Sequence, residues 1–239
     1  MSFTTWTPPA VSSEARRWRG VAWRMVEAQH VAATMKLVDD QREQDVLEAL
    51  LDASKPRPSA GTLELDYLLA TPFRYPTRRY GSRFRGPADP GVFYGAESVH
   101  AASAELGYWR WVFLQDAVDL ERLEPVAHTA FSVSVAAPAV DLRASPFDID
   151  AAAWMHPSDY SGTQAFARVA RSSLVDAIVY QSVRCPDPAW CVALLSPAAF
   201  ASRKPGPRRE TWYLAVSPAQ GTWRSQRGSM RFPTESWRT

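Results

Sequence analysis

The stretch GSRFRGPADPGVFYGAESVHAASAELGYWRW, residues 81–111, decides the fold. It opens as a loop rich in Arg, Gly and Pro. DPG at 89–91 then turns the chain into the apolar run VFYGA (92–96), which predicts a short buried strand. Ser98 is a favourable N-cap residue, so a helix is predicted from there to about Leu114. Loop, strand and helix form one unit around which the remaining elements are placed.

The segments before this unit predict one strand and two helices. Alternating apolar residues favour an early strand over 20–31. Asp40 caps a predicted helix over about 41–53, and a second short helix is predicted over 62–70, ended by Pro72. These two helices are either scaffold or an insertion that shapes a pocket.

The segments after the unit are short and rich in β-favouring residues. Their order predicts an α+β domain, with 19 prolines separating many short elements. In chain order the predictions are a strand at 129–136, a helix at 159–173 capped by Asp159, strands at 176–182 and 190–196, and a hairpin over 211–224.

Composition limits the class of protein. The chain has 239 residues, 46% of them hydrophobic, and a net charge of +2, which excludes an extended disordered chain and favours a single large domain. It contains no run of about 20 apolar residues and begins with a polar stretch, so we expect a cytoplasmic protein without a membrane span. Two cysteines, Cys185 and Cys191, and four scattered histidines have no metal-ligand spacing, so no metal site is predicted.

The charge is uneven along the chain. Residues 203–239 carry eight basic and two acidic residues, a charge of +6. We divide the chain into an extension (1–20), a main domain (21–202) with the helical insertion at about 40–70, and this basic extension (203–239). The basic extension is either a solvated end or a surface for nucleic acid or an acidic partner.

Five arginines lie between Phe73 and Arg85 with no acidic residue among them. Arginine forks on a loop before a strand suit a phosphate or pyrophosphate, but the same composition occurs on plain surfaces. The arginines are Arg74, Arg78, Arg79, Arg83 and Arg85.

Glu105 is the unusual residue of the predicted helix. Its neighbours one turn away are small or apolar, so its carboxylate is costly to bury without a partner. Either an arginine from the 74–85 stretch pairs with it, or it faces a cavity where positive charge develops on a substrate. Periodicity alone favours the structural pair.

Two further polar side chains lie at strand ends. Tyr94 ends the strand before the helix and is placed at the same pocket edge, although tyrosines there are commonly packing residues. Ser182 ends the 176–182 strand. Because no histidine is near it in sequence, a hydrogen-bonding role fits better than that of an activated nucleophile.

The 81–111 stretch, together with AIVYQSVR at 177–184, resembles the RES domain, the toxin of a bacterial toxin–antitoxin system named for its Arg, Glu and Ser. The family pattern is a glycine-flanked Arg before an aromatic residue, a Tyr ending the next strand, a Glu in the following helix and a distant Ser in a Tyr-x-Ser-x-Arg strand. These match Arg83, Tyr94, Glu105 and Ser182. The resemblance extends from about Trp23 to Phe200.

This resemblance implies an ADP-ribosyltransferase-like split, mostly antiparallel sheet with flanking helices and a cleft for NAD, which is a substrate rather than a cofactor. It implies cleavage at the nicotinamide–ribose bond by a glycohydrolase or phosphorylase that depletes cellular NAD. The alternative is mono-ADP-ribosyl transfer to a host protein, and a second alternative is a non-catalytic nucleic-acid-binding module.

The resemblance also implies a role for each matched residue. Glu105 would stabilise the cationic ribose, Arg83 would bind phosphates, Tyr94 would lie on the nicotinamide side and Ser182 would hydrogen-bond the substrate. The family has a further early arginine, for which we choose Arg24 on the first strand. Arg74, next to Tyr75, is the rival, and both are counted as substrate-binding candidates.

The chain departs from the family at one position and is expected to have a partner. Many relatives carry an Asn on the strand after the Tyr-x-Ser-x-Arg segment, but this chain contains no Asn, and Trp190 and Cys191 occupy that stretch. The family implies a small Xre-type helix-turn-helix antitoxin that blocks the cleft. Contact with nucleic acid is then expected only through the antitoxin.

Overall fold

The computed structural model describes residues 6–28, 40–54, 56, 60–75 and 81–238. Eight strands form one sheet in the order β1-β2-β5-β4-β3-β6-β7-β8, and every pairing except β3–β4 is antiparallel. The predicted α+β class with a mostly antiparallel sheet is confirmed. The strands are β1 (Arg16–Glu27), β2 (Phe93–Ala96), β3 (Leu123–Asp141), β4 (Ala177–Gln181), β5 (Trp190–Leu194), β6 (Arg209–Val216), β7 (Gln220–Ser225) and β8 (Gly228–Pro233).

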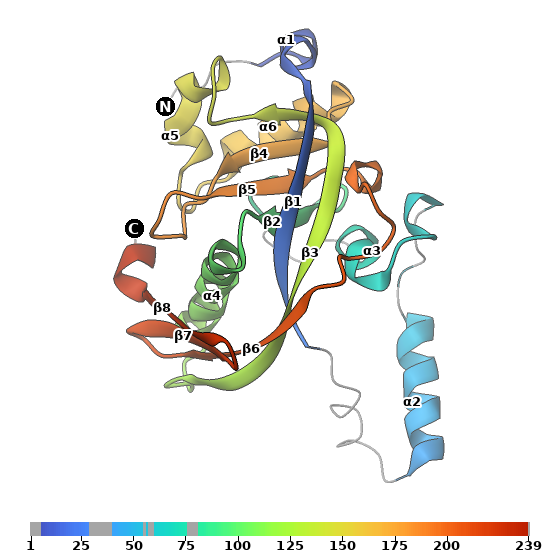
Figure 1. Ribbon diagram of the computed structural model, residues 1–239, viewed down its shortest axis with the longest axis vertical. Helices are drawn as coiled ribbons and strands as arrows, with labels where there is room; N and C mark the ends of the chain where they lie inside the picture. Colours follow the sequence, from blue (N-terminus) through green and yellow to red (C-terminus); the bar gives the residue numbers. More distant parts are fainter. Residues whose placement is uncertain (1–5, 29–39, 55, 57–59, 76–80, 239) are drawn as a thin grey trace.

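Helices α3, α4 and α6 lie against the sheet, whereas α2 stands apart from it (Figure 1). The α-helices are α1 (Pro8–Glu14), α2 (Gln41–Ser54), α3 (Tyr67–Arg74), α4 (Val99–Asp116), α5 (Ala151–Trp154) and α6 (Ser161–Ser172). Short 3-10 helices lie at Ala60–Thr62, Phe147–Asp150, Pro197–Ala199 and Thr234–Trp237. Among the described residues, no helix is long and apolar enough to cross a membrane.

Strand β3 organises the sheet because it pairs along both edges. One edge pairs with β1 from Arg16↔Ala139 to Glu27↔His128. The other edge pairs first with β6 and, at Ala139–Asp141, with β4. Since β1 also pairs with β2 at Trp23↔Ala96, the pairings β1–β2–β5–β4–β3 close on themselves. The sequence predicted only 129–136 of this 19-residue strand.

Two hydrophobic clusters lie on opposite faces of the strands. On β4, Ile178 and Tyr180 belong to the cluster that includes α4 and α6 residues, whereas Ala177 and Val179 belong to the second. The two-residue period of a strand explains this division, because successive side chains point to opposite faces. Leu68 and Leu69 of α3 pack into the second cluster. Helix α3 is therefore scaffold for the sheet.

Several predicted boundaries are corrected. The helix predicted over 62–70 begins only at Tyr67, because the Asp66 carboxylate accepts from the Leu68 N–H at 2.9 Å. It continues through Pro72, which lies close enough to the C-terminal end to remove only one late hydrogen bond. Tyr160, not Asp159, is the N-cap of α6, although the Asp159 carboxylate accepts from the Ser161 N–H at 2.9 Å.

Other boundaries agree with the sequence. Ser98 caps α4 by accepting from the Ala101 N–H at 3.1 Å, and Asp40 accepts from two N–H groups at the start of α2.

The first strand spans Arg16–Glu27, earlier than predicted, and the predicted residues 29–31 lie outside the described residues.

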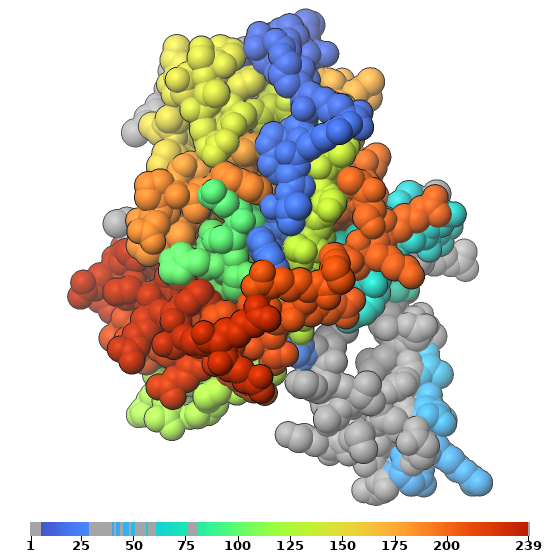
Figure 2. Space-filling view, viewed as in Figure 1, coloured from blue at the N-terminus to red at the C-terminus, as the bar shows by residue number. Residues whose placement is uncertain are grey.

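The C-terminal segment adds more than the predicted hairpin. Strands β6 and β7 form that hairpin, and β8 adds a third antiparallel strand that the sequence did not predict. Figure 2 shows β6–β8 as a continuous part of the molecular surface. Some of the basic charge of the segment is paired, since Arg208 and Arg227 both contact the buried Glu210 carboxylate.

Candidate active site

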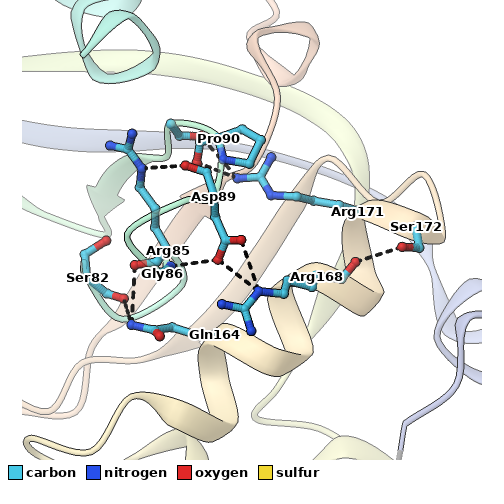
Figure 3. A network of polar contacts seen from close by, with 10 residues as sticks. Ser82, Arg85, Gly86, Asp89, Pro90, Gln164, Arg168, Arg171 and Ser172 are labelled. Carbon is cyan, nitrogen blue, oxygen red and sulfur yellow. Dashed lines mark hydrogen bonds and ion pairs between the residues drawn. The ribbon is translucent and has the colours of Figure 1, made fainter. Parts of the chain in front are cut away.

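The loop that carries Arg83 is fastened to α6. Gln164 donates its side-chain amide to the carbonyls of Ser82, at 3.0 Å, and Arg85, at 3.3 Å (Figure 3). Arg168 donates to the Asp89 carboxylate at 3.0 Å, and the same carboxylate accepts from the Gly86 N–H at 2.7 Å. These contacts link the two ends of the loop to one rigid helix.

Two additional features fix the same loop. The buried Thr163 hydroxyl contacts the Arg83 carbonyl at 2.5 Å. Gly81 has a φ of +66°, and a Cβ there would lie 2.4 Å from the Arg85 carbonyl oxygen, so both backbone shape and space require glycine. The glycine before Arg83 in the family pattern thus has a local structural reason.

The Arg83 side chain is 8% exposed. Its guanidinium donates to the carbonyls of Trp154, at 2.9 Å, and His156, at 3.0 Å, and lies 4.7 Å from the centre of the Tyr160 ring. Arginine forks held this way have fixed directions, so the remaining donors are oriented before any ligand arrives.

Glu105 on α4 meets Ser182 at the end of β4. The Ser182 hydroxyl donates to the Glu105 carboxylate at 2.5 Å, and the Cys191 thiol on β5 lies 3.7 Å from the same oxygen. Among the described residues, no arginine forms an ion pair with Glu105. Of the 74–85 arginines, Arg74, Arg83 and Arg85 therefore do not form the expected structural pair, Arg78 and Arg79 lie outside the described residues, and Glu105 lines a cavity. Cys191 occupies one side of this carboxylate.

Burial raises the pKa of the Cys191 thiol well above its ordinary value, and the nearby Glu105 carboxylate raises it further. The thiol is therefore neutral at physiological pH and acts as a weak hydrogen-bond donor rather than a nucleophile.

Arg184 is a further charged residue of the site. It is the arginine of the Tyr-x-Ser-x-Arg segment, and the sequence analysis gave it no role. Its guanidinium lies 3.4 Å from the centre of the Tyr108 ring and donates to the Pro157 carbonyl. The residue is 3% exposed, and its Nη1 has no hydrogen-bond partner among the residues that the structure describes. The sequence predicted it on the same strand face as Ser182, two residues away, but β4 ends at Gln181 and Arg184 lies in the turn that follows.

Arg24 and Tyr94 meet across β1 and β2. The Arg24 guanidinium donates to the Tyr94 carbonyl at 2.8 Å and lies over the Phe93 ring, while its buried Nε has no partner. Burial lowers the pKa of Arg24 to about 10, so the group is still charged at neutral pH. Arg24, the chosen early arginine, lines this cavity and also a second pocket beside α3, and its guanidinium packs on Phe93, a member of the second hydrophobic cluster.

The Tyr94 hydroxyl holds the Arg83 loop. It lies 2.7 Å from the Ser82 hydroxyl and accepts from the Phe84 N–H at 3.0 Å, while the tyrosine also lines the cavity. Burial raises the pKa of Tyr94, so this hydroxyl stays protonated at neutral pH.

These residues surround one cavity of about 200 Å³, here called the Glu105 cavity. Its charged lining is Arg24, Arg83, Glu105 and Arg184. Its aromatic lining is Trp23, Tyr94, Trp109, Tyr160 and Tyr180. Three guanidinium groups against one carboxylate leave an excess of two positive charges, so the cavity is suited to an anion that also carries an apolar ring.

The other predicted residues lie elsewhere. Arg74 donates to the Pro56 carbonyl at 2.5 Å, and the Tyr75 carbonyl accepts from Arg85, so neither side chain lines the Glu105 cavity. Arg78 and Arg79 lie outside the described residues. Within the described ranges, no cluster of three or more His, Cys, Asp or Glu side chains could hold a metal ion.

Comparison with known proteins gives a family match. The family model of the RES domain matches residues 57–217, more than half of the chain. No curated protein sequence matches. Among solved structures, the chain is similar to one in the crystal structure of the M. tuberculosis MbcT–MbcA toxin–antitoxin complex, with 13% identity and a TM-score of 0.46 over 89% of this chain and 92% of that chain. On the strength of the family match, the chain belongs to the RES domain family.

Proposed function

We propose that this protein cleaves NAD at the bond between nicotinamide and ribose. One observation carries the proposal. The Glu105 carboxylate faces a cavity in which the other charged groups are all arginines, and none of the described arginines forms an ion pair with it. A carboxylate oriented by a single serine hydroxyl is available to a positive charge on a ligand.

The reaction develops such a charge. When the glycosidic bond breaks, its electron pair moves to the nicotinamide nitrogen, which leaves as a neutral ring, and positive charge appears on the ribose carbon and ring oxygen. A preoriented carboxylate in a site that excludes water stabilises this oxocarbenium-like state. In the proposal, Glu105 has this role and Ser182 orients it.

The arginines would bind the pyrophosphate. The Nε of Arg24 and the Nη1 of Arg184 are buried N–H groups without partners, and phosphate oxygens are good acceptors for guanidinium groups. A cavity of about 200 Å³ is smaller than the ~300–1,000 Å³ typical for drug-sized ligands. We therefore assign it to the nicotinamide half of the dinucleotide, with the adenosine half outside, towards the half-exposed Trp109.

The acceptor of the ribosyl group is water, phosphate or a protein side chain. Each acceptor completes the reaction by bonding to the ribose carbon and losing a proton to solvent. The purified chain is incubated with NAD in buffer with or without phosphate, or with cell lysate and labelled NAD. We expect nicotinamide release in the purified system, with ADP-ribose or its 1-phosphate as the second product. Label on host proteins without release in the purified system would indicate ADP-ribosyl transfer, and absence of nicotinamide in all arms would refute the proposal.

The cellular role we propose is that of the toxin in a toxin–antitoxin pair, neutralised by a small helix-turn-helix partner. The resemblance of residues 81–111 and 177–184 to RES toxins supports this part of the proposal. Expression of the chain alone is expected to stop growth and lower cellular NAD, and co-expression with a neighbouring helix-turn-helix gene is expected to reverse both. Growth unaffected by the chain, at a confirmed expression level, would contradict the role.

A further inference from the structure

The last part of the chain lies beyond the family match. Residues 218–239 follow the matched range 57–217 and contain β7, β8 and the 3-10 helix Thr234–Trp237. Both strands extend the main sheet, and α4 lies beside them (Figure 1). This segment is therefore built into the same domain as the Glu105 cavity.

Trp237 anchors the segment in the core. It is 2% exposed, with its ring stacked on Phe232 at a centroid distance of 6.1 Å and near Trp111 and Tyr108. A Cβ at Gly107 of α4 would lie 3.1 Å from this ring, so the glycine leaves the space that the indole fills. Gly107 is on the same helix as Glu105, so the end of the chain packs against the helix that carries the candidate carboxylate.

The indole N–H of Trp237 has one specific partner. Its Nε1 donates to the carbonyl of Arg184 at 3.0 Å. The Arg184 guanidinium lies over the Tyr108 ring, whose edge in turn packs against Trp237 at 84°. Trp237 thus holds the backbone of Arg184 directly and its charged end through Tyr108.

The turn that contains Arg184 also holds Glu105. The Ser182 hydroxyl accepts from the N–H groups of Arg184, at 3.3 Å, and Cys185, at 3.1 Å, and donates to the Glu105 carboxylate. The backbone N–H of Arg184 is therefore fixed by Ser182 and its carbonyl by Trp237. Loss of either of these hydrogen bonds would release the backbone of Arg184, whose guanidinium lines the cavity.

We propose that Trp237 is a positioning residue for Arg184, so that the C-terminal segment outside the family match completes the anion-binding side of the Glu105 cavity. The choice of pyrophosphate as the ligand rests on the proposed function, whereas the contacts between Trp237 and Arg184 do not depend on it. It requires the indole N–H and not only the bulk of the ring.

The chain offers a matched control. Trp223 on β7 is also fully buried in the same cluster, but its Nε1 has no partner and it packs beside the His128 ring at 5.0 Å. Trp237→Phe and Trp223→Phe therefore remove similar volumes from neighbouring positions, and only the first removes a hydrogen bond to Arg184.

The experiment uses the full chain with three measurements on both variants: the Kd for inorganic pyrophosphate by calorimetry, KM and kcat for NAD, and amide hydrogen exchange of residues 182–185 without ligand. A hydrogen bond of ordinary net strength corresponds to about fivefold in affinity. We expect Trp237→Phe to weaken pyrophosphate binding by about that factor, to raise KM more than it lowers kcat, and to speed exchange at 182–185, whereas Trp223→Phe does none of these.

Equal behaviour of the two variants, or unchanged exchange and affinity in Trp237→Phe, would overturn the inference. Failure of the proposed function is distinguishable from this. If the unmodified chain neither cleaves NAD nor binds pyrophosphate, the proposed function fails, and the exchange comparison alone decides whether Trp237 holds the Arg184 turn.

Discussion

Ser182 and Glu105, 77 residues apart in sequence, are joined by a 2.5 Å hydrogen bond from the serine hydroxyl to the carboxylate. The serine ends a strand, and the glutamate lies in the second turn of a helix capped by Ser98. Because the same hydroxyl also accepts two backbone N–H groups, its rotation is fixed and it has one hydrogen to donate. The carboxylate is consequently held in one orientation toward the cavity.

Replacing Ser182 with Ala should lower kcat for NAD cleavage by about tenfold, the effect of about 1.4 kcal/mol on the barrier. The variant should also lose about 1–3 kcal/mol of unfolding free energy, because two N–H groups lose their acceptor. Ser103→Ala is the control, since Ser103 is fully buried on the same helix as Glu105 and donates only to the Val99 carbonyl. Steady-state kinetics and urea unfolding measure both effects. A Ser182→Ala enzyme with unchanged kcat would contradict the orienting role.

Replacing Arg24 with Met should raise the thermal midpoint and lower NAD affinity. Burial lowers the pKa of Arg24 to about 10, which means that the charged form is disfavoured in the folded protein. An apolar side chain of similar length removes that cost, about 3 kcal/mol for this shift, but also the hydrogen bond to the Tyr94 carbonyl, a loss of about 2 kcal/mol. The balance of about 1 kcal/mol corresponds to a midpoint about 3 °C higher in a chain of this size. Arg19→Met, at an exposed position of the same strand, should leave both quantities unchanged. A lower midpoint for Arg24→Met would refute the account of Arg24.

The pKa of Arg24 also determines how the midpoint difference between Arg24→Met and the unmodified chain depends on pH. Arg24 in the unfolded chain keeps its higher, ordinary pKa, so below pH 10 both states are charged and the full burial cost applies. Above pH 10 the folded form loses its proton first and the cost declines. The midpoint advantage of Arg24→Met should therefore be constant up to about pH 9 and shrink as the pH rises through about 10. Calorimetric melts between pH 7 and pH 11 test this, and an advantage that grows with pH would contradict it.

Replacing Thr163 with Val should loosen the loop that carries Arg83. The hydroxyl is buried and contacts the carbonyls of Arg83 and Tyr160, so its loss leaves a buried acceptor unsatisfied at a cost of about 1–3 kcal/mol. We expect weaker pyrophosphate binding together with lower stability. Ser172→Ala, which removes a hydroxyl that contacts only its own helix, is the comparison. Wild-type pyrophosphate affinity in Thr163→Val would show that α6 does not hold Arg83 in place.

The elements around residues 81–111 could be predicted because their signals are local. The apolar run before Ser98 and the small, apolar helix after it determine strand, cap and helix without information from elsewhere. Tyr180 and its neighbours likewise form a continuous apolar run, which is typical of a strand buried on both faces.

The missing parts depend on contacts between distant segments. One error was local: the start of the helix at Tyr67 was misplaced because the apolar residues before Asp66 also fit a helical period, although Asp66 is a strong N-cap. Periodicity placed Glu105 beside an arginine, but its partner Ser182 lies on another strand. Arg24 was chosen over its rival Arg74 because it lies on the predicted first strand, but its contact with Tyr94 depends on the pairing of β1 with β2.

The central claim is that the Glu105 carboxylate stabilises the cationic ribose of NAD. The measurement that tests it most directly is nicotinamide release by Glu105→Gln, which keeps the shape of the side chain and removes its charge, alongside NAD binding by calorimetry. Glu97→Gln is the control, because Glu97 is an exposed carboxylate outside the Glu105 cavity, where it accepts from the Trp190 N–H. The account predicts that Glu105→Gln binds NAD within a few-fold of the unmodified chain but releases nicotinamide slower by about 10³-fold, as loss of about 4 kcal/mol of transition-state stabilisation requires. Release at the unmodified rate by Glu105→Gln would contradict it.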